Sequence, residues 1–341
     1  MWMGFAREGE GVDKGIFGWK MARKRKRGGD EPSRWGLDKC LWRQMYPLVM
    51  ALPNISEQDV RDLLPAATSV AYLEHGGQKV VFRVELGGQA FVLKFALLSA
   101  SFQPDASGID DVVLRARRET LIMQECKSPH IVKMGPIELS TASVAGQNVL
   151  YFSEEFIEGQ TLASLIRQQG PLPVPSLVRL AKQMSSSIDE LWSVGKIHRD
   201  IKPSNVMQRS DGKNYVLLDA GLAFDVAGES ISSGFLVGTM AYFSPEQFDY
   251  TNRRVMDFRS DMFSLGVMLY EAATGEHPFL SRTTSTPHLF TKITTYNPPP
   301  PSSLNKAVPP TLDQIILRMM GKSPHLRFRR ISQVQDALAQ I

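Results

Sequence analysis

The most informative segment of the chain reads His198-Arg199-Asp200-Ile201-Lys202-Pro203-Ser204-Asn205, and Leu217-Leu218-Asp219 and then Gly221 follow shortly after it. Together these segments place a carboxylate, a cation and two further oxygen-bearing side chains on two short loops. A lone Asp after His-Arg is usually a turn residue or a helix cap. All four polar residues in this order are instead the combination that phosphoryl transfer requires.

Phosphoryl transfer needs positioned charge more than it needs covalent help. Asp200 is suited to accept the proton of the attacking hydroxyl, and Lys202 supplies a cation near the transferred group. Asn205 and Asp219 offer oxygen ligands to Mg²⁺ (or Mn²⁺), a type of metal that takes hard ligands and leaves its other positions to substrate phosphates. We therefore predict that these four residues form a catalytic centre.

The chain resembles the serine/threonine protein kinases in these residues and in further segments between about Thr68 and Ile341. Its sequence is closest to the bacterial members of that family. The resemblance implies an α+β, bilobal fold with a small β-rich N-lobe at about 66–157 and a larger, mainly helical C-lobe at about 158–341. It also implies transfer of the γ-phosphoryl group of ATP to Ser or Thr hydroxyls of protein substrates, with autophosphorylation.

A hairpin is predicted in the N-lobe from Val80–Val84 and Phe91–Phe95, joined by a glycine turn. Lys94 interrupts the second apolar run, where an unpaired ammonium would be costly. The helix predicted over 110–124 places Glu119 on its inner, apolar face. This pair matches the ion pair by which protein kinases hold nucleotide phosphates. In the alternative interpretation Lys94 reaches solvent from a strand edge and Glu119 is exposed.

The phosphate-covering loop departs from the family pattern G-x-G-x-x-G-x-V. Gly76 and Val81 are retained, whereas Glu74 and Lys79 stand where the first and third glycines belong. Since glycine lets the backbone approach phosphates closely, Glu74 is expected to weaken nucleotide binding. By resemblance Leu73, Gly76 and Val81 line the nucleotide. We hypothesise that the charge of Lys79 partly compensates, so that Lys79→Ala changes the apparent ATP affinity.

The segment 149–159 resembles the last N-lobe strand and the hinge. The resemblance implies that the backbone at Glu155 and Ile157 hydrogen-bonds the adenine edge. Glu154 would then line the back of the adenine pocket, where the family usually has an apolar or small residue. This is a second departure from the family.

Two long helices are predicted in the C-lobe. Apolar residues at helical spacing run from Leu177 to Leu191, and Gly195 is a good helix stop. It lies just before His198–Asn205, which we call the catalytic loop. The run Asp261–Tyr270 is apolar almost all round and predicts a buried helix; by resemblance, Asp261 braces the backbone of the catalytic loop. Pro298–Pro301 predicts a surface loop, with a proline-rich ligand for another domain as the alternative.

The segment from Asp219 to Glu246 matches the activation segment of the family. By resemblance Thr239 sits beside Asp200 and Lys202, and Glu246 pairs with Arg327. Lys202 together with Thr239 is typical of Ser/Thr-directed kinases, so Ser or Thr is the expected acceptor rather than Tyr. Small-molecule phosphotransferases share the Asp/Asn/Asp core but are not expected to carry this peptide-binding platform. A protein substrate is therefore predicted.

Regulation and activity leave further alternatives open. Arg199 implies control by a phosphate on the activation segment, with candidate hydroxyls at Ser230, Ser232 and Ser233; the alternative is that these are ordinary loop serines. Ala220 replaces the aromatic residue of Asp-Phe-Gly. This change, with the altered glycine loop, motivates a rival interpretation as a catalytically weak or inactive pseudokinase that acts as a nucleotide-binding scaffold.

Composition adds expectations about the rest of the chain. No run of about 18 apolar residues occurs, so no transmembrane segment is expected, and Cys40 and Cys126 lack metal-ligand spacing, which favours a cytoplasmic protein. Residues 1–65 carry 12 Lys/Arg against 9 Asp/Glu and are predicted to be a basic, flexible N-terminal extension before the kinase domain at 66–341. The dense run Arg23–Arg27 indicates an anionic partner, or else a solvated arm.

Overall fold

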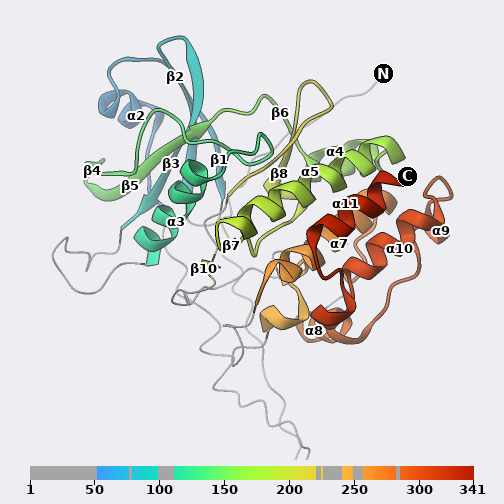
Figure 1. The fold of residues 1–341 in the computed structure, drawn as a ribbon. Helices are drawn as coiled ribbons and strands as arrows, with labels where there is room; N and C mark the ends of the chain where they lie inside the picture. Colours follow the sequence, from blue (N-terminus) through green and yellow to red (C-terminus); the bar gives the residue numbers. More distant parts are fainter. Residues whose placement is uncertain are drawn as a thin grey trace, which may run out of the picture. The chain divides into compact units, whose positions relative to one another are not determined.

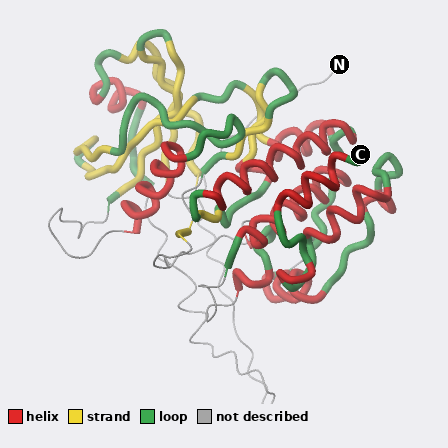
Figure 2. The backbone as a smooth tube through the Cα atoms, in the orientation of Figure 1, coloured by secondary structure: helices red, strands yellow, loops and turns green. Residues whose placement is uncertain are grey.

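The computed structural model describes residues 52–76, 79–98, 111–219, 224–225, 240–248, 256–281 and 285–341. Figure 2 shows strands concentrated in the N-terminal part of this range and helices in the C-terminal part. The predicted α+β class is confirmed, and we call the two groups of elements the N-lobe and the C-lobe.

The N-lobe is built on an antiparallel sheet with the strand order β1-β2-β3-β5-β4 (Figure 1). Its strands are β1 (Ala67–Gly76), β2 (Lys79–Leu86), β3 (Gln89–Leu97), β4 (Ser140–Val144) and β5 (Gln147–Glu155). The predicted hairpin is confirmed as β2 and β3, joined by a turn in which Gly87 and Gly88 both have positive φ (58° and 78°). Glycine adopts this conformation without a steric penalty.

The sequence predicts a short helix from Ser56 to Leu64 with Ser56 as its N-cap. The structure confirms it as α2 (Glu57–Leu63), which precedes the sheet and has Ser56 as its N-cap. The Ser56 hydroxyl accepts a hydrogen bond from the Asp59 backbone N–H, and the Asp59 carboxylate accepts one from the Ser56 N–H, which forms a capping box. Ile55 and Val60 are buried against one face of the sheet. Residues 55–64, placed with the N-terminal extension on sequence grounds, thus pack on the N-lobe.

The opposite face of the sheet packs on α3 (Asp111–Glu125). Because side chains alternate along a strand, residues of even number in β3 and β5 share this face, and the residues between them face α2. Val113, Ala116 and Met123 of α3 are buried in one cluster with Leu150 and Phe152 of β5. The predicted helix is thus confirmed one residue further along the chain, with its apolar side on the sheet.

Helices make up most of the C-lobe. They are α4 (Leu162–Gln169), α5 (Val174–Ser193), α7 (Phe258–Thr274), α8 (Thr286–Thr295), α9 (Pro301–Leu304), α10 (Pro310–Met319) and α11 (Ile331–Ala339). Short 3₁₀ turns lie at η1 (Pro203–Asn205), η3 (Pro245–Phe248) and η5 (Pro324–Leu326).

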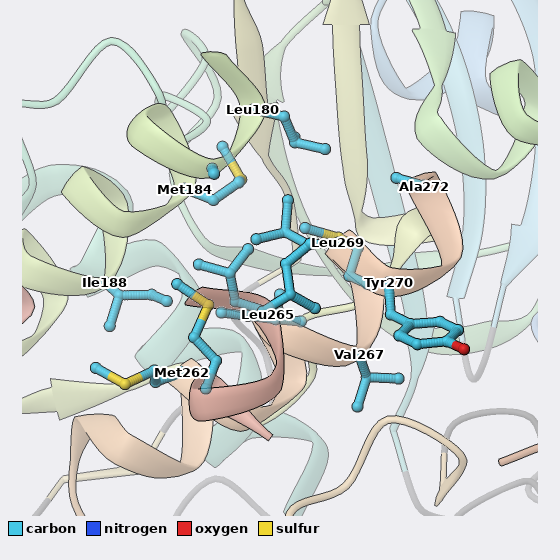
Figure 3. Packing of buried hydrophobic residues seen from close by; sticks show 14 of the residues in the cluster. Leu180, Met184, Ile188, Met262, Leu265, Val267, Leu269, Tyr270 and Ala272 are labelled. Carbon is cyan, nitrogen blue, oxygen red and sulfur yellow. The ribbon is translucent and has the colours of Figure 1, made fainter. Parts of the chain in front are cut away.

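The core of the C-lobe forms where α5 packs on α7. Leu180 and Met184 of α5 point toward Met262, Leu265 and Leu269 of α7 (Figure 3). α7 is buried almost all round, as predicted, and it begins at Phe258 with Asp257 as its N-cap, three residues before the predicted start. These two helices are the rigid support for the loops described below.

Small strands carry those loops. They are β6 (Gly159–Thr161), β7 (Lys196–Ile197), β8 (Val206–Arg209), β9 (Tyr215–Leu217) and β10 (Phe224–Asp225). One small sheet has the order β6-β8-β9, and β7 pairs with β10. The segment from His198 to Asn205 therefore connects β7 to β8, each of which is paired with another strand. Asp219 lies two residues after the end of β9.

The prediction of a surface loop at Pro298–Pro301 is wrong in part. Pro298 and Pro301 are buried, whereas Pro299 and Pro300 are exposed. Pro301 opens α9, at the helix position where a missing N–H costs nothing. Over the described ranges of the chain, no helix is long and apolar enough to cross a membrane.

Candidate active site

The backbone of the catalytic loop is held by a buried carboxylate from α7. Asp261 accepts hydrogen bonds from the backbone N–H groups of His198 (2.6 Å) and Arg199 (2.8 Å). Burial raises the pKa of Asp261 to about 6, against the effect of these two hydrogen bonds. The bracing role predicted for Asp261 is present in the geometry.

Asp200 presents one satisfied and one unsatisfied oxygen. Its Oδ2 accepts from Lys202 Nζ (2.8 Å) and from Asn205 Nδ2 (2.9 Å). Its Oδ1 is buried and has no hydrogen-bond partner among the described residues. Burial raises the pKa of Asp200 to about 6, although Lys202 acts in the opposite direction. A buried oxygen without a partner is costly, and a substrate hydroxyl would relieve that cost.

The ring of His198 connects the catalytic loop to the loop that carries Asp219. Its Nε2 lies 3.0 Å from the carbonyl oxygen of Leu218, and its Nδ1 accepts from the backbone N–H of Asp200 at 3.3 Å. Burial lowers the pKa of His198 to about 4, so the ring is neutral near pH 7. Since Nδ1 accepts, Nε2 carries the proton and donates it to Leu218.

Two residues of these loops adopt a backbone conformation that side chains other than glycine rarely take. Arg199 has φ 68° and Asp219 has φ 56°. Residues in the left-handed region cost free energy and persist where the surrounding structure holds them. For Arg199 the hydrogen bond to Asp261 provides that hold. Such strain gathers at functional sites, in agreement with the sequence prediction for this region.

The ion pair predicted between strand and helix is present. Lys94 Nζ of β3 lies 2.9 Å from Glu119 Oε1 of α3, and the Glu119 side chain is fully buried. Lys94 also forms an ion pair with Glu154 of β5, at 2.7 Å between Nζ and Oε2. Burial alone would lower the pKa of Lys94, but the carboxylates of Glu119 and Glu154 raise it well above its ordinary value.

Lys79 makes contacts that sequence reasoning missed. Its Nζ lies 2.5 Å from Glu119 Oε2 and 3.1 Å from Asp219 Oδ1. Burial would lower the pKa of Lys79, yet the charges of Asp219 and Glu119 raise it. In turn, Lys79 and Lys94 outweigh the effect of burial and hold the pKa of Asp219 far below its usual range. The lysine in the third glycine position therefore reaches the candidate metal ligand.

The residues predicted to surround the nucleotide base lie on the N-lobe sheet and just after it. Leu73 is exposed on β1, Gly76 pairs with Lys79 at the end of the β1–β2 hairpin, and Val81 and Ile157 are buried. The backbone N–H of Glu155 donates to the Lys133 carbonyl at 2.9 Å. Of the backbone groups of Glu155, its carbonyl is therefore the one that fits the hinge contact predicted from the sequence.

The predicted pair between Glu246 and Arg327 is confirmed. Arg327 Nη1 lies 2.6 Å from Glu246 Oε1, and Nη2 lies 2.9 Å from Oε2. Thr239, the three candidate serines 230, 232 and 233, Ala220 and the basic run 23–27 lie outside the described residues.

The residues present fit a divalent metal held in part by substrate. Within the described ranges, no group of three or more His, Cys, Asp or Glu side chains could hold a metal ion alone. Asn205 donates through Nδ2 to Asp200, which leaves its amide oxygen as the atom suited to a cation, and Asp219 offers a carboxylate. Two such oxygens suit a hard cation that takes its remaining ligands from phosphates and water.

Comparison with known proteins gives one consistent result. The family described as protein kinase domain matches residues 85–338. The serine/threonine-protein kinase PknE of Mycobacterium bovis is 31% identical over 256 residues, which is 74% of this chain and 42% of the relative. PknH of the same organism is 30% identical over 260 residues, 75% of this chain and 40% of the relative. The chain thus spans about two fifths of the length of these relatives. From the family match and the geometry above, we conclude that the chain belongs to the protein kinase family.

Proposed function

We propose that the chain is an ATP-dependent serine/threonine protein kinase. The observation that carries the proposal is the arrangement around Asp200: one carboxylate oxygen is held by Lys202 and Asn205, and the other is buried and unsatisfied. In this role Oδ1 of Asp200 orients the substrate hydroxyl and accepts its proton. Lys202, already beside this carboxylate, places positive charge where the transferred phosphoryl group gains negative charge.

Asn205 and Asp219 would hold the divalent metal, Mg²⁺ or Mn²⁺. When bound, such a metal neutralises charge on the nucleotide phosphates and keeps them oriented. The chain's own contribution is to fix the two oxygens: Asn205 through its hydrogen bond to Asp200, and Asp219 through its strained backbone after β9. Because His198 ties the two loops together, the base and the metal ligands keep one mutual geometry.

The nucleotide would lie on the α3-facing side of the N-lobe sheet. The pair of Lys94 and Glu119 is supported by its geometry and by the family match. The proposed contacts to the base and ribose are Leu73, Gly76, Val81, Glu155 and Ile157. For Glu155 this contact is assigned to the carbonyl.

Protein is the proposed phosphate acceptor, at Ser or Thr hydroxyls. The names of PknE and PknH state this specificity for the relatives, and Lys202 stands two residues after the base, as in Ser/Thr-directed kinases. The pairing of Glu246 with Arg327 supports a family-type anchor at the end of the activation segment. Thr239 beside the base, phosphorylation of the three candidate serines and an anionic partner for residues 23–27 stay predictions.

The rival interpretation as a pseudokinase is not favoured. Lys94, Glu119, Asp200, Asn205 and Asp219 are all retained, and the contacts between Lys94 and Glu119 and between Asn205 and Asp200 support a catalytic arrangement. A scaffold without chemistry gains nothing from a buried, unsatisfied carboxylate oxygen. The named relatives are kinases.

The test is transfer of labelled phosphate from ATP to a generic basic protein in the presence of Mg²⁺. Wild type is expected to label Ser or Thr of that protein, whereas Asp200→Asn and Asp219→Asn lose at least about a hundredfold in rate. Asp189→Asn, the same change at an exposed position on α5, is the matched control and retains the activity. ATP binding by a wild type that transfers no phosphate under these conditions would favour the pseudokinase instead.

A further inference from the structure

Five charged side chains form one continuous series, from the N-lobe sheet to the loop after β9, in which the sign of the charge alternates. In order they are Glu154, Lys94, Glu119, Lys79 and Asp219. The successive nitrogen–oxygen distances are 2.7, 2.9, 2.5 and 3.1 Å. Each oxygen of Glu119 therefore has its own lysine: Oε1 meets Lys94 and Oε2 meets Lys79.

The register of the sheet explains why three strands contribute to this series. Lys94 stands opposite Val81 of β2 and opposite Phe152 of β5. Lys79 and Glu154 are each two residues from those positions, so all of these side chains emerge on the face that α3 covers. The ring of Phe152 lies beneath both ammonium groups, with its centroid 5.6 Å from Lys79 Nζ and 5.9 Å from Lys94 Nζ.

The two lysines differ in what surrounds them. The Lys94 side chain is 8% exposed and lies between two carboxylates, one of which, Glu154, is 6% exposed. The Lys79 side chain is 20% exposed and its second partner, Asp219, is 45% exposed. The series thus runs from a buried end at Glu154 to an open end at Asp219.

Access decides which of the two lysines can attract an anion, because the count of charges is the same for both. Each lysine lies between two carboxylates, Lys94 between Glu154 and Glu119 and Lys79 between Glu119 and Asp219. Lys79 lies toward the open end, beside the carboxylate proposed to hold the metal, and the positive charge of that metal would offset the charge of Asp219. Glu154 is the added negative charge, and Lys79 is the added positive charge at the other end. The pair leaves the total charge of the site unchanged but moves the accessible positive charge from β3 to the start of β2.

We propose that Lys79, rather than Lys94, supplies the ammonium group that contacts the nucleotide phosphates, and that Lys94 and Glu154 form a buried structural pair. The inference rests on the proposed function, because it concerns how the same nucleotide is held. The proposal assigns a role to both departures from the family pattern. These are Lys79 at the third glycine position and Glu154 at the back of the adenine pocket.

The experiment compares binding of ADP with Mg²⁺ and binding of adenosine, by titration calorimetry. Adenosine lacks phosphates, so the ratio of the two affinities isolates the phosphate contact from any general damage to the site. Lys79→Met is expected to lower ADP affinity about tenfold or more, and adenosine affinity less than twofold, since it removes a charged hydrogen bond. The double variant Lys94→Met/Glu154→Met removes both partners of the buried pair but also the lysine beside Glu119 Oε1. Its effect is therefore measured as the ratio of ADP affinity to adenosine affinity, which is expected to fall less than in Lys79→Met.

Two further variants keep the result interpretable. Lys79→Arg retains the charge and is expected to keep most of the ADP preference, whereas Lys79→Gln, which is neutral but polar, is expected to lose it. Lys182→Met on the exposed side of α5 is the matched control for loss of one positive charge. Thermal unfolding of each variant confirms that it is folded before binding is measured.

The proposal is overturned if Lys79→Met and Lys79→Gln bind ADP like wild type, or if the ratio of ADP affinity to adenosine affinity falls as much in the double variant as in Lys79→Met. These results would leave the proposed function intact. A wild type that binds ADP no better than adenosine would overturn the nucleotide site itself, before any variant is compared.

Discussion

The ion pair between Glu246 and Arg327 predicts a large and specific loss of stability on substitution of the arginine. The Arg327 side chain is fully buried, and Glu246 is 19% exposed. Besides the carboxylate, Arg327 donates to the carbonyl oxygens of Gly321 (2.8 Å) and Arg259 (2.7 Å). Its guanidinium also lies over the ring of Phe263, at 4.9 Å from the ring centroid.

The perturbation is Arg327→Met, which keeps an unbranched apolar side chain over the Phe263 ring but removes the charge. Removing one partner of a buried pair leaves the other uncompensated, which costs about 3–5 kcal/mol. The double variant Arg327→Met/Glu246→Gln leaves no charge unpaired and is expected to recover part of that loss. The assay is urea unfolding at pH 7, with the free energy of unfolding extrapolated to water.

The pH dependence gives a second check. Burial opposes ionisation of Glu246, but the hydrogen bonds and charge of Arg327 outweigh it and lower the pKa of the carboxyl. A carboxyl with a lowered pKa in the folded state stabilises the fold above its unfolded pKa of about 4.3, and this contribution disappears as the pH falls below that value. The difference in the free energy of unfolding between wild type and Arg327→Met should therefore decrease toward pH 3. The explanation would be wrong if Arg327→Met lowered the free energy of unfolding by less than about 1 kcal/mol at pH 7, or if its difference from wild type did not change with pH.

Three other predictions follow from local geometry. Asp261→Ala removes the acceptor of two backbone N–H groups in the catalytic loop, including that of His198, and is expected to lower the phosphate-transfer rate about a hundredfold; an unchanged rate in a kinase assay would contradict it. Gly266→Ala places a Cβ 2.8 Å from Met319 Cβ, between α7 and α10, and should lower the free energy of unfolding in urea by about 1–3 kcal/mol. A free energy of unfolding equal to that of wild type would show that the two helices can move apart without cost. Ser56→Ala removes the N-cap of α2 and should cost about 1 kcal/mol, with faster amide hydrogen exchange confined to that helix.

Several features could be predicted from the sequence because each depends on a local pattern. A lysine inside an apolar strand demands a carboxylate, and helical periodicity identified Glu119 as the residue that provides it. Apolar spacing likewise identified α5, and a serine before an acidic turn identified the cap of α2. The pair of Glu246 and Arg327, far apart in the sequence, was accessible only through the resemblance to kinases.

The contacts of Lys79 and Glu154 could not be predicted in the same way. They depend on the register of three strands, which brings positions 79, 94 and 154 onto one face of the sheet. A shift of one residue in either strand pair would have turned these side chains to the opposite face. The sequence identified both residues as departures from the family, and only the pairing of the strands reveals that the departures compensate each other in charge.

The neutral imidazole of His198 has a consequence for how the site responds to its surroundings. A ring that protonates only near pH 4 keeps one tautomer throughout the range in which cells live. Its two hydrogen bonds, to Leu218 and to the backbone of Asp200, therefore survive moderate acidification unchanged. The hydrogen bonds of the His198 ring are thus insulated from everyday swings in acidity, whereas Asp200 and Asp261, whose pKa burial raises to about 6, respond to them.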